Sequence, residues 1–367
     1  MAPNTSSTPD QAGRWIVTKF GGPDVLKWET FDPYSELSAD GVIVRIIVGG
    51  IAGPDNLQRV GGYPNPLTKH PGFTPGYDFV GEVIALGPSV PESSKLAVGD
   101  HVTSMCVVGA HATHTVIRSS ELIRIERTDD PIKVCALPLN YMTAWGMLDQ
   151  CGVNLPPGST ILVGSVSGGL GTAVAEIVRA FDFKIKIIGT CSPSKFDYVK
   201  SLGVIPIDRH APDLVEQVKA LTNGEGVDVA YDAVGSDESL EKSYLATKKD
   251  VGQVIVTGIM SEIATDGSGL LQKDNFNAHA TIATRMRPRM KHWSVDRDFY
   301  QVDKPLWFKG FYALLEKVRS GELSPTIAKL FRLSEGKTAH EYLVSGTAVK
   351  GKMVFIADGD LAAKYGL

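Results

Sequence analysis

The sequence lacks most features that mark disulfide-rich, zinc-finger or membrane-spanning proteins. Its four cysteines are too widely spaced for a disulfide framework or for paired zinc-binding dipeptides; they are Cys106, Cys135, Cys151 and Cys191. We therefore expect four reduced thiols, most of them buried. No apolar run reaches the length of a transmembrane helix, so we expect no membrane partner.

Dense basic clusters are also scarce. The formal net charge is −4, so nucleic acid and anionic membranes are not expected partners. The one basic run, Arg285 to His292, matches no motif, and we expect a solvated loop; contact with a dimer edge or an anionic substrate stays open. Residues 1–14 are polar and resemble neither a signal nor a transit peptide. We interpret them as a disordered lead-in to a cytoplasmic protein.

What is present divides into three regions, and 367 residues exceed what one hydrophobic core usually serves. Residues 15–137 contain short apolar runs with glycine-rich turns, which favours a β-barrel or sandwich. Over residues 138–300, short strands alternate with helical segments, which indicates a parallel sheet covered by helices. Residues 301–367 are mixed, with an amphipathic helix at 306–320 and a terminal strand at 351–357.

A glycine-rich turn lies between an expected strand at 160–164 and an expected helix. Such a turn lets backbone N–H groups approach a pyrophosphate at a helix N-terminus, so we expect a dinucleotide. Ser165 takes the place of the first glycine of the usual motif, and a purely structural turn is the alternative. The expected cofactor contacts here are Ser165, Ser167, Gly168, Gly169, Leu170 and Gly171.

The segment after the next strand indicates which dinucleotide binds. An NADH site places a carboxylate there for the ribose hydroxyls, but the first carboxylate is Asp197. Ser192 and Lys195 follow this strand instead, and Arg209 follows the third. These residues suit a 2′-phosphate, so we expect NADPH. The alternative is that Ser192 caps a helix and Lys195 is a solvated surface charge.

Four segments carry a wider pattern: FGGPDVL at 20–26, TPGYDFVGEV at 74–83, PLNYMTAW at 138–145 and GKMVF at 351–355. Together they resemble the quinone oxidoreductase and enoyl reductase branch of the medium-chain dehydrogenase/reductase superfamily, over nearly the whole chain. The resemblance implies an α/β protein with a GroES-like β-barrel catalytic domain, built from residues 15–137 and 301–367. It also implies a doubly wound Rossmann domain for NADPH over residues 138–300.

The resemblance also assigns roles to single residues and to the assembly. It implies that Thr143 lies near the nicotinamide and that Gly258 is a further cofactor contact. It implies a homodimer joined through the Rossmann domain. The remaining partner would be a small electrophilic substrate.

The metal question depends on two positions. Zinc alcohol dehydrogenases of this superfamily carry a cysteine and a histidine where this chain has Ala52 and Tyr77, neither of which suits zinc. His111 and His114 are three residues apart, but we expect a solvated pair. We therefore expect no metal. Without a Lewis acid, hydride transfer to an electron-poor carbon is favoured, so an enone, an enoyl thioester or a quinone fits.

The candidate acid is Tyr63, which precedes Pro64 in a loop resembling the one that carries a proton-donating tyrosine in zinc-free enoyl reductases. The alternative is that Tyr63 is an aromatic lid over the nicotinamide. We interpret Tyr77 as a packing residue. Two other functions stay open: a zinc-independent alcohol or carbonyl oxidoreductase, and a non-catalytic structural or RNA-binding relative.

Overall fold

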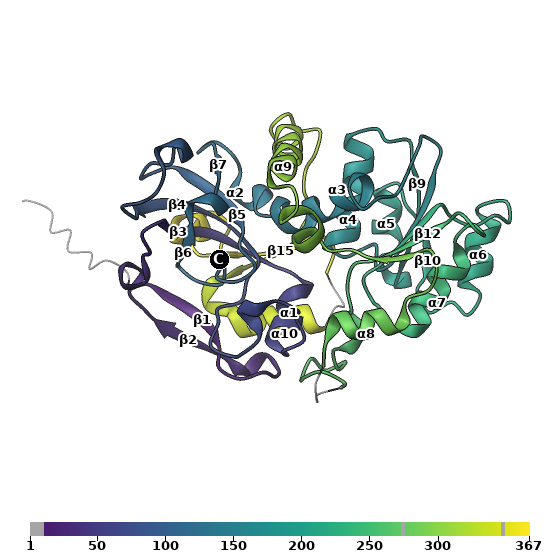
Figure 1. Ribbon diagram of the computed structural model, residues 1–367, viewed down its shortest axis with the longest axis horizontal. Helices are drawn as coiled ribbons and strands as arrows, with labels where there is room; N and C mark the ends of the chain where they lie inside the picture. The colour runs from purple at the N-terminus through teal and green to yellow at the C-terminus, as the bar shows by residue number, and fades with distance from the viewer. Residues whose placement is uncertain (1–10, 273–275, 346–348) are drawn as a thin grey trace, which may run out of the picture.

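The computed structural model of the chain describes residues 11–272, 276–345 and 349–367. The chain forms a β-rich half and a half of alternating strands and helices, which lie at the left and right of Figure 1. We call them the catalytic half and the Rossmann half. The fold class expected from the sequence, a GroES-like β-barrel domain with a parallel-sheet cofactor domain, is confirmed.

The catalytic half contains a seven-stranded sheet in the order β14-β15-β3-β4-β5-β7, with β6 paired to β3. The longest strand of this sheet, β3, is rich in β-branched residues and is buried on both faces. The last strand, β15, pairs antiparallel with β3, so distant parts of the chain share one sheet. The strands are β3 (Gly41–Ile51), β4 (Asp78–Leu86), β5 (His101–Met105), β6 (His114–Arg118), β7 (Ile123–Ile125), β14 (Ile327–Arg332) and β15 (Lys352–Ile356), beside a hairpin of β1 (Gly13–Val17) and β2 (Leu26–Thr30).

The Rossmann half has a six-stranded parallel sheet in the order β10-β9-β8-β11-β12-β13. The strand order reverses between β8 and β11, and ligands of such sheets bind at the carboxyl ends beside that point. The strands are β8 (Thr160–Val163), β9 (Lys186–Cys191), β10 (Ile205–Asp208), β11 (Val229–Asp232), β12 (Gln253–Val256) and β13 (Met290–His292). The helices are α4 (Gly169–Ala180), α5 (Phe196–Ser201), α6 (Leu214–Ala220), α7 (Asp237–Ala246) and α8 (Ala278–Arg285).

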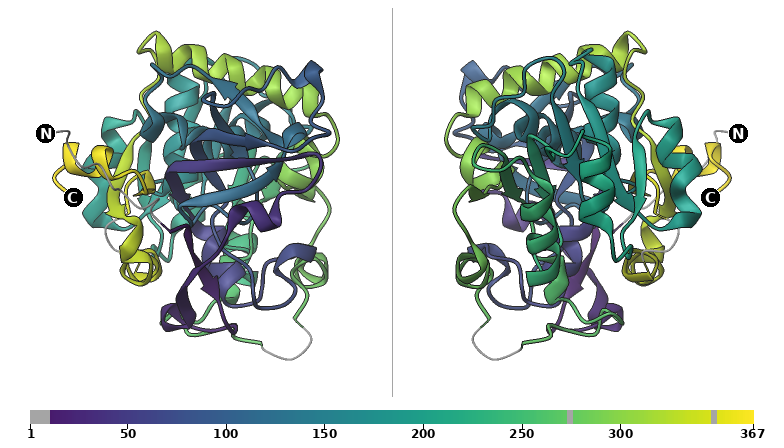
Figure 2. Two further views of the ribbon diagram at one scale, coloured as in Figure 1. Left: turned by 90° about the vertical axis from the view of Figure 1, so that its left-hand side faces the viewer. Right: turned by 90° about the vertical axis from the view of Figure 1, so that its right-hand side faces the viewer.

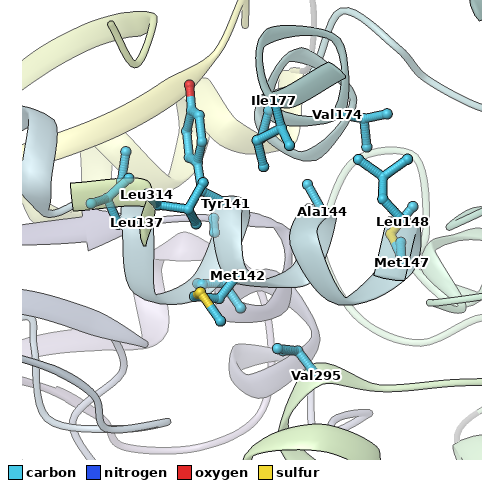
Figure 3. Close-up of a cluster of buried hydrophobic side chains, with 14 of the residues drawn as sticks. Leu137, Tyr141, Met142, Ala144, Met147, Leu148, Val174, Ile177, Val295 and Leu314 are labelled. Atoms are coloured by element: carbon cyan, nitrogen blue, oxygen red, sulfur yellow. The ribbon is translucent and has the colours of Figure 1, made fainter. Parts of the chain in front are cut away.

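The two halves share one continuous hydrophobic cluster. At its centre, a π-helical turn, Leu137–Tyr141, leads into α3 (Met142–Asp149). In the side views of Figure 2, α9 (Lys304–Arg319) lies along one edge of the molecule, and it packs on α3. Figure 3 shows Ala144 and Leu148 turned toward Val174 and Ile177 of α4. The other helices are α1 (Gly53–Arg59), α2 (Pro131–Val134), α10 (Gly336–Ser345) and α11 (Gly359–Lys364).

Only part of the basic run is the solvated surface that we expected: Arg287 and Lys291 are exposed, but several of its cations have specific partners. Arg285 pairs with Glu262 at 2.8 Å, and Lys291 donates to the carbonyl of Cys151 at 2.7 Å. Arg289 donates to the carbonyl of Lys248 at 3.1 Å. The run ends in β13, the edge strand of the Rossmann sheet. Arg289 and Lys291 therefore satisfy backbone oxygens of buried or half-buried residues, and Arg285 pairs with a carboxylate. Both roles depend on distant partners and leave no local motif.

The disordered lead-in that we expected over residues 1–14 ends earlier than predicted, because β1 begins at Gly13. Gly13 and Arg14 belong to β1, which pairs with β2, and the Arg14 side chain also forms ion pairs with Glu29 at 3.0 Å and with Glu36 at 2.9 Å. Residues 1–10 lie outside the described part of the chain. The four cysteines are free thiols and three are buried, as expected. Within the described ranges, no helix has both the length and the apolar character needed to cross a membrane.

Candidate functional site

The glycine-rich turn connects β8 to α4 beside the point where the strand order reverses. Ser165 holds the left-handed conformation, with φ of 53°, which explains why glycine usually occupies this position. Gly168 caps α4 without a side chain, so no side chain competes for the first helical N–H groups. A Cβ at Gly171 would lie 2.4 Å from Cα of Val166, so only glycine lets the turn and helix pack this closely.

The rest of the turn contacts the catalytic half. The N–H of Gly351, just before β15, donates to the carbonyl of Ser167 at 3.3 Å. A Cβ at Gly169 would lie 2.5 Å from Nδ2 of Asn140. Ser167 is buried and Leu170 is half-buried. The structure thus places the predicted turn residues at the start of α4, where a pyrophosphate binds in folds of this kind.

The residues expected to recognise a 2′-phosphate lie beyond the ends of β9 and β10. Lys195 is buried, and its ammonium donates to the carbonyl of Val349 at 3.3 Å, so it is not a solvated surface charge. Ser192 precedes a short helix but makes no capping hydrogen bond through its side chain. Burial and the nearby Arg209 lower the pKa of Lys195. A phosphate dianion would offset that repulsion, so the residues present fit the group.

Lys350 is a residue that the sequence analysis missed. Its charge also acts to lower the pKa of Lys195, and its Nζ lies 5.5 Å from the ring centre of Tyr198. The Tyr198 hydroxyl lies 2.9 Å from Oγ1 of Thr172 on α4. Lys350, which belongs to the catalytic half, thus adds its charge to those of Lys195 and Arg209 in the Rossmann half. No local signal could have found it, because its neighbour Val349 is 154 residues from Lys195.

The remaining predicted contacts lie on separate elements. Thr143 is buried on α3, and its hydroxyl donates to the carbonyl of Leu139 at 2.6 Å. Gly258 follows β12, and a Cβ there would lie 2.7 Å from the carbonyl oxygen of Ala233, just beyond β11. Gly258 therefore lies at the carboxyl end of the parallel sheet, where a dinucleotide of this fold would bind.

The two tyrosines singled out from the sequence form a pair. Their hydroxyl oxygens lie 2.7 Å apart, and their rings meet edge to face with centres 5.9 Å apart. Tyr77 is only 1% exposed, whereas Tyr63 is half-buried and packs against hydrophobic clusters that include both halves. The interpretation of Tyr77 as a packing residue is therefore incomplete, since its hydroxyl contacts the candidate acid.

A buried ion pair lies directly after Tyr77 in the chain. The ammonium of Lys352 lies 2.8 Å and 2.9 Å from the carboxylate oxygens of Asp78 and donates to Oδ1 of Asn140 at 3.1 Å. A Cβ at Gly50 would lie 1.7 Å from Asp78, so glycine provides the space for the pair. Through Asn140, the charges of the catalytic sheet are connected to the glycine-rich turn.

A second buried acid, Asp55, lies in the first turn of α1, which begins directly after Ala52. Its Oδ2 accepts from the N–H of Ala52 at 2.7 Å and lies 3.8 Å from Nε2 of His111. Burial raises the pKa of Asp55 to about 7 and lowers the pKa of His111 to about 4. His111 is thus buried, contrary to our expectation of a solvated pair, because its ring hydrogen-bonds to the carbonyl of Gly50 at 2.9 Å. His114 is half-buried on β6.

Comparison with known proteins identifies the class. Residues 38–127 match the family of alcohol dehydrogenase GroES-like domains, and residues 169–297 match the zinc-binding dehydrogenase family. A 2-haloacrylate reductase of Burkholderia sp is 28% identical over 347 residues, 93% of this chain and 98% of that protein. A probable quinone oxidoreductase of Schizosaccharomyces pombe is 27% identical over 349 residues, 94% of this chain and 97% of that protein.

A solved structure extends the comparison to the whole fold. The Escherichia coli quinone oxidoreductase complexed with NADPH superposes with a TM-score of 0.79 at 23% identity, over 94% of this chain and all of that one. The chain belongs to the medium-chain dehydrogenase/reductase superfamily of oxidoreductases. Within it, the chain falls in the branch of quinone oxidoreductases and enoyl reductases that its sequence resembles. In the described residues, no group of three or more His, Cys, Asp or Glu side chains could hold a metal ion.

Proposed function

We propose that this protein transfers hydride from NADPH to an activated C=C bond, as in an enone or enoyl thioester, without a metal ion. The observation that carries the proposal is the half-buried Tyr63 hydroxyl, placed where the two halves meet. Gly53, at the start of the helix α1 that precedes the Tyr63 loop, would have its Cβ 3.4 Å from Cε of Met260 in the Rossmann half. A quinone is the second candidate, supported by the likeness to proteins named quinone oxidoreductase.

NADPH is supported by both ends of the cofactor site. The glycine-rich turn offers N–H groups at the start of α4 for the pyrophosphate. Lys195, Arg209 and Lys350 bring positive charge to the place of the adenosine 2′-phosphate. The bound cofactor supplies a hydride, and the protein holds and orients it.

The residues of the chain then provide the proton. When hydride reaches the β-carbon of an enone, the displaced electron pair forms an enolate. The O–H bond of Tyr63 breaks, and its proton moves to the α-carbon or to the enolate oxygen. Burial raises the pKa of Tyr63, so the hydroxyl keeps its proton until this charge develops. Solvent restores the proton afterwards.

The absence of a metal is proposed from the side chains at the two ligand positions. Ala52 offers only a methyl group, and the Tyr77 hydroxyl is already hydrogen-bonded to the hydroxyl of Tyr63. A buried ammonium, Lys352, already neutralises the neighbouring carboxylate of Asp78. Elemental analysis of the purified protein should find no stoichiometric zinc, and activity should persist in a chelator.

The function is tested by following NADPH absorbance with an enone and with a quinone, for the parent protein and for Tyr63→Phe. We expect the variant to lose about a hundred- to ten-thousand-fold of kcat on the enone. Quinone turnover should fall far less, because quinone oxygens can take protons from water. Tyr34→Phe, an exposed tyrosine of the same half, is the control and should change neither rate.

Two outcomes would redirect the proposal. If Tyr63→Phe reduces the enone at the parent rate, Tyr63 is only a lid. If the parent oxidises NADPH with neither substrate, the carbonyl oxidoreductase and the non-catalytic alternatives come forward.

We also propose that the protein is a cytoplasmic homodimer. The edge position of β13 supports this, since an edge strand can pair with its copy across a twofold axis. Light scattering should give twice the monomer mass.

A further inference from the structure

We propose that Tyr77 is a positioning residue whose hydroxyl donates to the oxygen of Tyr63 and so directs the Tyr63 proton toward the substrate. This inference rests on the proposed function, because it assigns the support of the acid named there. Tyr77 stands at a position where related zinc enzymes hold a metal ligand. Its hydroxyl oxygen lies 2.7 Å from that of Tyr63.

Burial decides the direction of this hydrogen bond. Tyr77 is 1% exposed, so its hydroxyl proton has no access to water. Within the described residues, 11–272, 276–345 and 349–367, the one hydrogen-bond partner of the Tyr77 hydroxyl is the hydroxyl of Tyr63. If Tyr63 donated instead, the Tyr77 proton would be left without an acceptor, which carries the full cost of a buried unsatisfied donor. Tyr77 therefore donates, and the Tyr63 proton is left to point elsewhere.

The position of Tyr63 determines where its proton points. Tyr63 is half-buried and packs against residues of both halves, whereas Tyr77, just before β4, is almost fully buried in the hydrophobic core. With its oxygen accepting from Tyr77, the remaining direction for the Tyr63 O–H is away from that core. A substrate bound between the halves would meet an oriented donor, and orientation of this kind reduces the reorganisation needed in the transition state.

The same hydrogen bond supports the charge that develops on Tyr63. Burial raises the pKa of Tyr63, and the bond from Tyr77 acts to lower it. Asp296 and Asp55 face Tyr63 and oppose ionisation; Asp296 and the thiol of Cys106 do the same at Tyr77. Tyr77 is thus the group in this set that stabilises the phenolate left when the Tyr63 O–H bond breaks and the new C–H bond forms.

The test is a double-mutant cycle on Tyr63→Phe and Tyr77→Phe with the enone. Removing a hydrogen bond to a developing charge should lower kcat of Tyr77→Phe by about ten- to a hundred-fold, with KM and NADPH affinity near the parent values. The double variant should be no slower than Tyr63→Phe alone, because Tyr77 acts only through Tyr63. Quinone turnover is the internal control and should barely change.

Two further measurements support the cycle: the first keeps the hydroxyl in place, and the second does not depend on activity. A 3-fluorotyrosine at position 77 keeps the hydroxyl but makes it a stronger donor, so kcat on the enone should stay equal or rise. In the protein without cofactor, the ζ-¹³C NMR signal of Tyr63 should move in Tyr77→Phe and stay fixed in Tyr34→Phe.

The outcomes are separable. Additive losses in the double variant, or an equal fall with the quinone, would overturn the positioning role. So would parent-like enone turnover in Tyr77→Phe while Tyr63→Phe is impaired, and the proposed function would then stand. Parent-like turnover in Tyr63→Phe would overturn both.

Discussion

Two groups of charged side chains differ in how their charges are arranged. In the catalytic half, Asp78 and Lys352 are opposite charges in contact, and both are almost fully buried. At the edge of the Rossmann half, Lys195, Arg209 and Lys350 gather like charges, and Lys195 has a lowered pKa. Each member of a buried ion pair depends on the other for the stability of the fold, whereas gathered like charges suit a site that binds an anionic ligand. Variants in the first group should therefore change stability, and variants in the second should change binding.

The largest expected effect is on Lys352. Lys352→Met leaves Asp78 buried without its cation and should cost about 3–5 kcal/mol of unfolding free energy. Urea unfolding measures this, and Lys69→Met, an exposed lysine of the same half, is the control. The double change Asp78→Asn with Lys352→Met should recover part of the loss. A single variant as stable as the parent would show that the pair contributes nothing to the fold.

The buried carboxyl of Asp55 should make the stability of the catalytic half depend on pH. Its pKa is raised from 3.8 in the unfolded chain to about 7 in the fold, so the folded state keeps a proton that the unfolded state loses. This contribution is present below about pH 4 and is lost as the pH rises through about 7. Asp55→Asn should match the parent at pH 5 and be more stable by about 2–4 kcal/mol at pH 8.5.

Thermal unfolding at the two pH values checks this prediction. His111 does not complicate the comparison, because its ring is neutral in both folded proteins across this range, with a pKa of about 4, and titrates alike in both unfolded chains. A difference between Asp55→Asn and the parent that is the same at both pH values would show that Asp55 titrates normally.

How much of this the sequence could predict depends on the distance between partners. The alternation of strands and helices and the glycine-rich turn are local patterns, and both predictions match the fold. The pair Asp78–Lys352 joins residues 274 apart, and Lys352–Asn140 joins residues 212 apart. No spacing rule contains such contacts. The Tyr63–Tyr77 hydrogen bond was missed for a different reason: both residues were noted, but composition cannot show where a hydroxyl points.

In the second group, Lys195→Ala should weaken NADPH binding by about ten- to a hundred-fold, the effect of losing a charge-assisted contact of about 1.5–3 kcal/mol. NADH binding should barely change, and stability should stay near the parent value. Cofactor fluorescence titration measures both affinities. Lys200→Ala, an exposed lysine on α5, is the control. Equal losses for both cofactors, or a parent protein that prefers NADH, would reject the phosphate site.

The smallest effect is expected at Lys350, which tests whether the catalytic half contributes to the same phosphate site. Lys350 is exposed, so its contact is screened by solvent and should be worth about 0.3–1 kcal/mol, a two- to five-fold loss of NADPH affinity. The loss should shrink as salt rises from about 0.05 M to 0.5 M, because exposed charges are screened over a shorter distance there. Lys364→Ala, exposed in the same half, is the control. A loss that also appears with NADH, or that persists at high salt, would place Lys350 outside the phosphate site and leave recognition to the Rossmann half alone.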